Sequence, residues 1–486
     1  MNSNQIPNWL NGNESPALSG EWFDKLNPAT GQVIYQAARS NKGDIQMAVS
    51  TAKAAQPAWA ATPPVQRGMI LHQMVIGMQN RQREIAEIVA AETGKSFNDA
   101  FGEVGGAIQL GLFYASEGQR LYGRTTTSGT PNKYASTVRQ PIGVAGLIIA
   151  ANTPIANVAW KIFPALICGN AAVLKAAEDT PATAWIVGQI ANAAGLPPGV
   201  LNIIQGLGEE AGALLVEHPD VGVISFTGST EVGRFIQRAA GERLARISLE
   251  LGGKNSLVVC DDADLENAAK WVLLSAFSNA GQRCASASRI IIFDSIYQKF
   301  RDMLVERTRK LKVGTSNDDD LGPVINENQM KSILDMIDLA KKKGAIILTG
   351  GSRLEDPDHK NGYFISPTLI EGVDPHDEIS EFEMFGPVAV LFTAKNFEEA
   401  LALANDSPYG LTASIHTKNL HRAISFCDRV ESGVAVVNAG THGSEPHMPF
   451  GGRKFSGNGT REPGTEALDV YSELKDIYIN INPSQA

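Results

Sequence analysis

The chain has 486 residues, of which 43% are hydrophobic and 19% charged, a composition typical of a folded globular protein and unlike a disordered one. At about 150 residues per domain, it should contain two or three domains. Its 42 basic and 52 acidic residues give a net charge of −10, which disfavours binding to nucleic acid or to an anionic membrane. Small molecules are therefore the expected partners.

No segment predicts a membrane span or a targeting signal. The longest apolar runs, such as 144–151, are far shorter than the roughly 20 residues of a transmembrane helix, and the first residues lack the basic and apolar parts of a secretory signal. The four cysteines form no CxxC pair, and the histidines show no metal-ligand spacing. We therefore expect a cytoplasmic protein with free thiols and no metal site.

The region 142–260 alternates short apolar strands with helices. Strands are predicted over 143–150, 171–175, 200–204, 221–226 and 246–249. Helices are predicted between them, over 154–167, 181–194, and from Glu209 and Ser229. Thr180 is expected to cap the second helix, with Pro181 at its first position. Such an alternation indicates a parallel sheet that is covered on both faces.

A second alternation predicts another α/β domain, with strands over 256–260 and 289–293 and helices over 264–278 and 295–311. Residues 43–120 have helical spacing and should wrap the first sheet. The segments 124–141 and 475–481 have the pattern of edge strands. Because an exposed edge favours pairing with another chain, we expect a homodimer or homotetramer.

Two motifs carry the chemistry. The run Glu250-Leu-Gly-Gly-Lys254 begins 34 residues before Cys284 (284 − 250), which stands in the run Asn279-Ala-Gly-Gln-Arg-Cys-Ala-Ser. Together they resemble the signature sites of the NAD(P)-dependent aldehyde dehydrogenase superfamily. The resemblance covers nearly the whole chain and includes LNPATG at 26–31, FTGST at 226–230, EMFGP at 383–387 and PFGG at 449–452.

The resemblance implies an α/β fold of two doubly wound parallel-sheet domains, a Rossmann-like cofactor domain and a catalytic domain, plus a small β oligomerisation element. The implied boundaries are 1–122 and 142–252 for the dinucleotide-binding domain, 253–468 for the catalytic domain, and 123–141 with 469–486 for the oligomerisation element.

Cys284 is the candidate nucleophile. A lone cysteine is most often a packed small hydrophobe, but the polar Gly-Gln-Arg turn before it predicts an accessible thiol whose thiolate is favoured by nearby donors. The resemblance assigns to Cys284 the attack on the aldehyde. The remaining cysteines, Cys168, Cys260 and Cys427, match no catalytic position of the family.

Attack of a thiolate on an aldehyde produces an oxyanion, which needs hydrogen-bond donors already in place. The resemblance assigns this role to Asn152, just past the strand 143–150, together with the backbone N–H of Cys284. It also implies that Glu250 activates the water that hydrolyses the thioester, and that Lys161 assists proton transfer. Without the resemblance, Asn152 is an ordinary turn residue and Glu250 a surface acid.

The cofactor site lacks the usual fingerprint, because no GxGxxG follows a first strand. The run 228–233 instead opens a helix, whose N-terminus suits a pyrophosphate, although such a turn is usually only a helix cap. The resemblance places Ser229 at the pyrophosphate and Lys175 with Glu178 at the adenosine ribose. Because a carboxylate repels a 2′-phosphate, Glu178 favours NAD over NADP. The other implied cofactor residues are Ile149, Gly208, Gly212, Phe226, Gly228, Val232, Leu251, Gly252, Glu383 and Phe385.

Two departures from the family pattern bear on the substrate. Small residues, Ala151 and Thr153, flank Asn152 where the family commonly has an aromatic, and the loop 438–448 contributes His442 and His447. Both features favour a polar aldehyde or a semialdehyde over a long alkyl one. Two alternatives remain: an enzyme that passes the acyl group to coenzyme A, which an acid at position 250 disfavours, and a non-catalytic structural or binding use of the fold.

Overall fold

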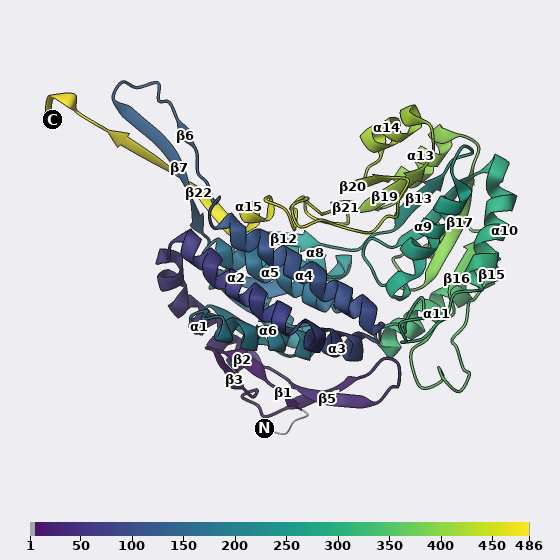
Figure 1. The fold of residues 1–486 in the computed structure, drawn as a ribbon, viewed down its shortest axis with the longest axis horizontal. Helices are drawn as coiled ribbons and strands as arrows, with labels where there is room; N and C mark the ends of the chain where they lie inside the picture. The colour runs from purple at the N-terminus through teal and green to yellow at the C-terminus, as the bar shows by residue number, and fades with distance from the viewer. Residues whose placement is uncertain (1–4, 486) are drawn as a thin grey trace.

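Two α/β lobes lie side by side, and a β arm projects from the first of them (Figure 1). The structure is a computed structural model, and it describes residues 5–485. Each lobe is built on a seven-stranded sheet in which most neighbouring strands are parallel. The predicted α/β class with two parallel-rich sheets is thus confirmed.

The first sheet has the strand order β12-β11-β8-β9-β10-β2-β3, with only the last two strands antiparallel. Its strands are β2 (Asn8–Leu10), β3 (Asn13–Ser15), β8 (Val144–Ile148), β9 (Ala171–Lys175), β10 (Leu201–Ile204), β11 (Val221–Thr227) and β12 (Arg246–Glu250). The parallel strands occupy the predicted positions, because they are mostly apolar; β8, β9 and β10 are buried along their whole length. β8 is shorter than the predicted 143–150.

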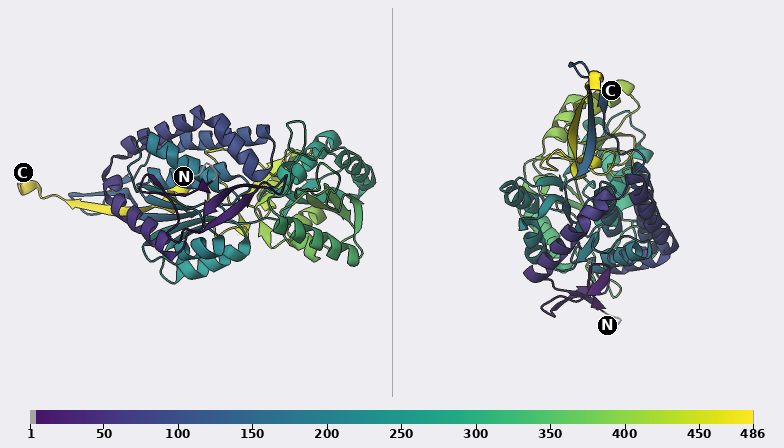
Figure 2. Two further views of the ribbon diagram at one scale, coloured as in Figure 1. Left: turned by 90° about the horizontal axis from the view of Figure 1, so that it is seen from below. Right: turned by 90° about the vertical axis from the view of Figure 1, so that its left-hand side faces the viewer.

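Helices cover both faces of this sheet (Figure 2). The face that carries α5 (Pro154–Ile167) and α6 (Pro181–Ala193) is covered further by α2 (Pro64–Asn80), α3 (Gln82–Thr93) and α4 (Phe97–Glu117). The opposite face packs against α1 (Lys42–Ala61), α7 (Ala213–Glu217), which follows the π-helical turn η1 (Gly208–Gly212), and α8 (Thr230–Gly241). Of the helices predicted within 43–120, only α1 therefore lies on the sheet strands themselves, whereas α4 packs on α5.

The expected cap of α6 is wrong. The side chain of Thr180 makes no capping hydrogen bond, because the carboxylate of Glu92 on α3 takes that place. It accepts the N–H groups of Ala182 at 2.7 Å and Thr183 at 3.0 Å. A long-range acid thus satisfies the first turn of the helix.

Near the N-terminus a small sheet of order β1-β5-β4 was not predicted. Its strands are β1 (Gln5–Ile6), β4 (Trp22–Leu26) and β5 (Val33–Ala38). They are short and mix exposed with buried residues, so the sequence shows no clean alternation.

The second sheet has the order β15-β16-β17-β14-β13-β19-β20, and only β15 is antiparallel. Its strands are β13 (Asn255–Val259), β14 (Ala287–Phe293), β15 (Ile346–Thr349), β16 (Thr368–Glu371), β17 (Val388–Ala394), β19 (Thr412–His416) and β20 (Val434–Val437). Helices α9 (Leu265–Phe277) and α10 (Tyr297–Thr308) cover one face, and α11 (Glu327–Lys342), α13 (Phe397–Asn405) and α14 (Leu420–Arg429) cover the other. The short α12 (Glu378–Glu381) packs against α11.

The two predicted edge segments pair with each other. β22 (Ser472–Asn480) is antiparallel to β7 (Lys133–Pro141) along its whole length, and β6 (Thr125–Thr126) adds a third strand. β22 remains the outer edge of this arm. The short elements β18 (Tyr409–Gly410), β21 (Arg453–Lys454) and α15 (Ala467–Tyr471) complete the fold. Within residues 5–485, no helix has the length and apolar character that crossing a membrane requires.

Candidate active site

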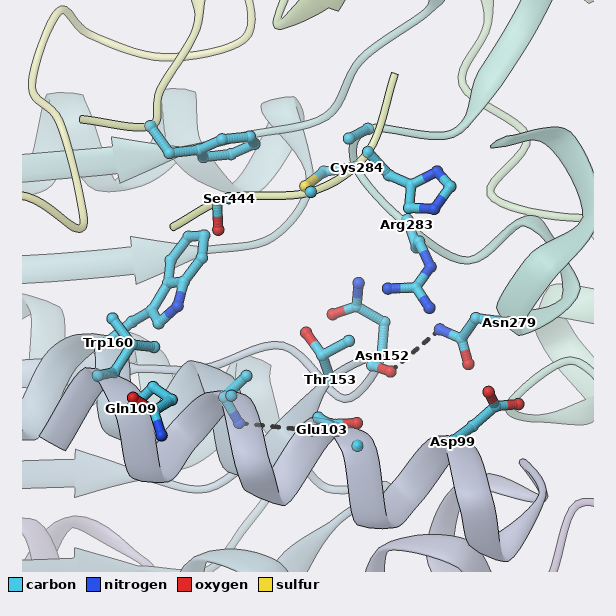
Figure 3. Close-up of a pocket in the computed structure, with 18 of the residues that line it drawn as sticks. Asp99, Glu103, Gln109, Asn152, Thr153, Trp160, Asn279, Arg283, Cys284 and Ser444 are labelled. Atoms are coloured by element: carbon cyan, nitrogen blue, oxygen red, sulfur yellow. Dashed lines mark hydrogen bonds between the residues drawn. The ribbon is translucent and has the colours of Figure 1, made fainter. Parts of the chain in front are cut away.

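A cavity of about 600 Å³ contains Cys284. Its walls come from α4 and α5 of the first lobe and from the segments 279–285 and 442–450 of the second (Figure 3). Trp160 and Phe450 form an aromatic wall, with their ring centroids 5.5 Å apart. The two lobes therefore build the cavity together.

A strained turn leads into Cys284. Asn279, Ala280 and Gly281 have φ values of +54°, +53° and +69°, a left-handed conformation that costs about 1 kcal/mol or more for each residue with a side chain. A Cβ at Gly281 would lie 2.1 Å from the carbonyl oxygen of Gly386, so only glycine fits there. After this turn the Cys284 side chain is partly exposed in the cavity.

The expectation of a favoured thiolate is wrong. Burial raises the pKa of the Cys284 thiol to about 12, and the carboxyl groups of Glu383 and Glu250 act in the same direction. The guanidinium of Arg283 opposes them without compensating. Loss of solvent thus outweighs the donors of the turn, and a base must take the thiol proton before Cys284 can attack.

Asn152 lies in the same cavity, next to the segment that precedes Cys284 (Figure 3). Its Nδ2 donates to the carbonyl oxygen of Gln282 at 2.9 Å. Its own backbone carbonyl accepts from Lys95 Nζ at 3.0 Å and from Asn279 Nδ2 at 3.2 Å. The predicted oxyanion donor and the predicted nucleophile are thus brought together.

Glu250 ends β12 and is buried, with its carboxyl group close to Gly451, where a Cβ would lie 2.8 Å from Oε1. Neither carboxyl oxygen has a hydrogen-bond partner among the described residues. Burial and the nearby charge of Glu462 raise the pKa of Glu250 well above its ordinary value, against the opposing charge of Lys161. Glu250 is not one of the residues that line the cavity, but it lies close enough for its negative charge to raise the pKa of the Cys284 thiol.

Lys161 does not reach the cavity. It is fully buried, and its Nζ donates to Ser225 Oγ at 2.6 Å and to Glu462 Oε2 at 3.2 Å. Tyr471 also donates to Glu462, at 3.0 Å. Lys161 therefore belongs to a buried polar network with Ser225 and Glu462. Glu462 is a member that the sequence did not indicate.

A second cavity, of about 830 Å³, lies where strands β8, β9 and β11 end and helix α8 begins. This is the edge of an open parallel sheet at which ligands bind. Lys175 and Glu178 border it and are joined by a hydrogen bond of 2.8 Å. The predicted cofactor residues that line it are Ile149, Lys175, Glu178, Gly208, Gly212, Phe226, Gly228 and Val232.

The other predicted cofactor residues lie outside this lining. The Ser229 hydroxyl accepts the N–H of Val232 at 3.3 Å and so caps α8. Glu383 accepts the N–H of Gly253 at 2.9 Å, and burial raises its pKa to about 7. A Cβ at Gly252 would lie 1.8 Å from Glu383 Oε2, so only glycine at position 252 leaves room for the Glu383 carboxyl group.

Two further predicted cofactor residues lie close to these. Phe385 adopts φ +50° two residues after Glu383, and Leu251 packs against Gly233 of α8, where a Cβ would lie 2.6 Å from its Cδ2. Eight predicted cofactor residues therefore line the second cavity. Ser229 and Leu251 lie at helix α8, which begins there, and Gly252 lies against Glu383.

Comparison with known proteins decides the family. A sequence model described as "Aldehyde dehydrogenase family" matches residues 16–477. The chain belongs to the aldehyde dehydrogenase family. It is 38% identical to the alpha-ketoglutaric semialdehyde dehydrogenase of Bacillus subtilis, over 98% of each chain. It is also 38% identical to retinaldehyde dehydrogenase 3 of Mus musculus, over 97% of this chain and 92% of that one.

Solved structures agree with this assignment. The crystal structure of betaine aldehyde dehydrogenase from Staphylococcus aureus in complex with NAD⁺ superposes with a TM-score of 0.96 at 32% identity, over 98% of this chain and 95% of that one. The protein is therefore an aldehyde-oxidising enzyme. This excludes the alternative of a purely structural or binding use of the fold.

The main residue of this aldehyde dehydrogenase that sequence reasoning missed is Arg283. It lines the cavity beside Cys284, and Figure 3 shows its guanidinium pointing into the space between Asn279 and Asn152. Its Nε is buried without a hydrogen-bond partner, and no carboxylate within residues 5–485 forms an ion pair with it. In the sequence, its position directly before the predicted nucleophile Cys284 could have indicated that Arg283 belongs to the site.

Of the predicted polar flank, Thr153 and His442 line the cavity, whereas Ala151 lines the second one. Burial and the charge of Arg283 lower the pKa of His442 to about 4, so its ring is neutral. His447 is exposed, 3.6 Å from Glu445, and is not among the lining residues. The polar character of the cavity is thus carried by residues other than His447.

Proposed function

We propose that this aldehyde dehydrogenase oxidises a short aldehyde that carries a carboxylate, a semialdehyde of a dicarboxylic acid, and that it uses NAD. The observation that supports this is the unpaired guanidinium of Arg283 in the cavity of Cys284. The Arg283 side chain is half-buried, with only its Nε fully enclosed, and its guanidinium has no carboxylate partner among the described residues of the cavity wall. A substrate carboxylate would supply the opposite charge and accept two parallel hydrogen bonds.

The other charges of the cavity leave Arg283 available. Glu103 is already bonded to Lys95 at 2.6 Å, and Asp99 and Glu445 lie on exposed parts of the wall. The chain is as similar to a retinaldehyde dehydrogenase as to a semialdehyde dehydrogenase, with 38% identity to each. Overall sequence identity therefore does not distinguish between their substrates. The chemistry of the cavity favours the relative whose name specifies a semialdehyde.

The residues suit a two-stage reaction. The Cys284 thiol first gives its proton to solvent water. The sulfur then forms a bond to the aldehyde carbon, and the carbonyl electrons move to oxygen, where the Asn152 amide and the Cys284 N–H donate. Re-formation of the C=O bond expels a hydride, which NAD accepts when it is bound, and leaves a thioester. Glu250 then takes a proton from water, the water oxygen attacks the thioester, and the Cys284 sulfur leaves as the carboxylate product forms.

The negative charge of Glu178 in the second cavity favours NAD over NADP. Glu178 stands at the end of β9 with its carboxylate bonded to Lys175, where it would accept a ribose hydroxyl and repel a 2′-phosphate. Hydrolysis is preferred over transfer to coenzyme A because the buried carboxyl group of Glu250 can serve as the base that an attacking water requires.

The substrate proposal is tested with pentanal and 5-oxopentanoate, which share a chain length and differ in the terminal carboxylate. We expect kcat/KM for 5-oxopentanoate to fall about 30- to 150-fold in Arg283→Met, the effect of losing about 2 to 3 kcal/mol from a charged hydrogen-bonded pair. Pentanal reports any general damage to Cys284 and should change little. Arg283→Lys should be intermediate, since it keeps the charge and loses the planar fork.

Equal losses for the two aldehydes in Arg283→Met would contradict the proposal. Measuring the same rates with added coenzyme A addresses the alternative. An acceleration by coenzyme A, with an acyl-coenzyme A product, would favour acyl transfer over hydrolysis.

We further infer the roles of the larger units. Residues 1–122 with 142–252 would act as the dinucleotide-binding domain and 253–468 as the catalytic domain, in support of which each range contains one of the two large sheets. Residues 123–141 and 469–486 would join two or four copies, since the arm exposes Tyr134, Leu474, Tyr478 and Ile479. The four unpaired cysteines suit a cytoplasmic location.

A further inference from the structure

We propose that Lys95 is a positioning residue for Asn152, and that it does so together with Asn279 of the other lobe. This inference concerns the oxyanion and is independent of the substrate proposed above. It starts from the backbone carbonyl of Asn152, which accepts from Lys95 Nζ at 3.0 Å and from Asn279 Nδ2 at 3.2 Å. The bond from Asn279 is drawn in Figure 3.

These two bonds matter because the Asn152 side chain is poorly fixed by its own contacts. Its Nδ2 makes one bond, to the Gln282 carbonyl, while its Oδ1 is buried without a partner among the described residues. One hydrogen of Nδ2 therefore remains for the oxyanion. The direction of that hydrogen depends on where the backbone of residue 152 is held.

Lys95 is itself held rigidly. Its side chain is 6% exposed and bonded at 2.6 Å to Glu103, whose side chain is 7% exposed. The second oxygen of Glu103 accepts the N–H of Ile155 at 3.1 Å, at the start of the helix that follows Asn152. Glu103 thus fixes both Lys95 and the N-terminus of α5. Asn152 lies just before α5, and its carbonyl is bonded to Lys95.

Asn279 fixes the same carbonyl from the opposite side. It belongs to the left-handed turn before Cys284, and its Nδ2 also donates to the Gln282 carbonyl at 3.2 Å. Lys95 lies between α3 and α4 of the first lobe, whereas Asn279 precedes β14 of the second. The pair therefore ties Asn152 to Cys284 across the boundary between the lobes.

The test is a double-mutant cycle on the NADH burst of the full-length enzyme, measured by stopped-flow absorbance. Removing an oxyanion donor costs about 100- to 1,000-fold in rate, so Lys95→Met, which only misplaces the donor, should slow the burst about 10- to 100-fold. In the Asn152→Ala background, Lys95→Met should cause less than about a twofold further loss, because effects of residues that act together are not additive. Asn279→Ala should behave in the same way.

Three controls separate positioning from other roles. Arg120→Met removes a cation from the buried carboxylate of Glu117 on α4, the helix that also carries Glu103. Both Arg120 and Glu117 lie outside the two cavities, so this variant should leave the burst rate unchanged. Alkylation of Cys284 by iodoacetamide, followed by peptide mass spectrometry, forms no oxyanion and should proceed equally in Lys95→Met and in the wild type. Where Lys95→Met folds poorly, Lys95→Met with Glu103→Gln removes both charges of the pair and serves instead.

Equal fold losses in the wild-type and Asn152→Ala backgrounds would overturn the proposal, because Lys95 would then act independently of Asn152. A loss seen with 5-oxopentanoate and absent with pentanal would also overturn it, since Lys95 would then bind the substrate carboxylate. Because pentanal has no carboxylate, failure of the semialdehyde assignment leaves this cycle interpretable.

Discussion

In the proposed mechanism, Glu250 sets the pH range in which the thioester is hydrolysed. Burial raises its pKa, and its two oxygens lack partners among residues 5–485. The carboxyl group must lose its proton before it can accept one from water. Thioester hydrolysis should therefore accelerate as the pH rises through this raised pKa.

Glu250→Gln should release one equivalent of NADH in a burst and then stall, because the thioester forms and no base activates water. The burst amplitude and the steady rate are read from one stopped-flow trace. Steady turnover at the wild-type rate would remove Glu250 from its role.

The same substitution should also stabilise the fold. In the folded wild type the carboxyl keeps its proton up to its raised pKa, whereas in the unfolded chain it ionises above about pH 4.3. The free energy of unfolding therefore falls as the pH rises from there to the raised pKa, and glutamine does not titrate. Glu250→Gln should thus raise Tm more at pH 8 than at pH 5, as calorimetry would measure, and an increase that is independent of pH would contradict this reasoning.

We propose that Glu178, which is bonded to Lys175, determines the choice of cofactor. Glu178→Gln should raise kcat/KM for NADP about tenfold, because one repulsive charge disappears and Lys175 becomes available to a 2′-phosphate. The ratio of NADP to NAD efficiencies, measured with one aldehyde, is the readout. A ratio that stays at the wild-type value would assign the preference to other residues of the second cavity.

At the scale of elements, the sequence is most informative where a strand is buried on both faces. β9 and α5 occupy their predicted ranges, since continuous apolar residues between Gly and Pro leave few alternatives. β1, with two residues, has too little pattern to be found. The cap of α6 was missed because Glu92 lies some 90 residues away in the chain, and only packing brings it there.

The β arm formed by β6, β7 and β22 is the element that we expect to join subunits. Leu474 and Ile479 are each 54% exposed on β22, whose outer edge is unpaired within the described residues. Replacing both by Glu should convert the expected dimer or tetramer into monomers, as sedimentation velocity would measure, because charges on an apolar contact oppose its burial. Leu18→Glu, at a 61% exposed leucine outside the arm, should leave the assembly intact. A monomeric wild type would refute the proposed role of the arm.

At the scale of the whole molecule, the site forms only when two lobes meet, and this limits what sequence can reveal. Asn152 and Cys284 could be predicted because each stands in a run of residues that resembles a family motif. The contacts of Lys95 with Asn152, and of Lys161 with Glu462, join residues 57 and 301 positions apart. The raised pKa of Cys284 was mispredicted for the same reason, since the carboxyl groups that raise it in addition to burial, Glu383 and Glu250, are remote in the chain.

The distribution of the four cysteines makes the enzyme convenient to label. Cys427 on α14 is exposed, Cys168 and Cys260 are buried, and the thiols of these two, like that of Cys284, have pKa values raised to about 12. Because thiol reagents attack the thiolate at an accessible sulfur, a maleimide dye at neutral pH should attach first at Cys427. A fluorophore can therefore be placed on the outer helix of the second lobe, distant in sequence from every proposed catalytic residue, without removing a single native thiol.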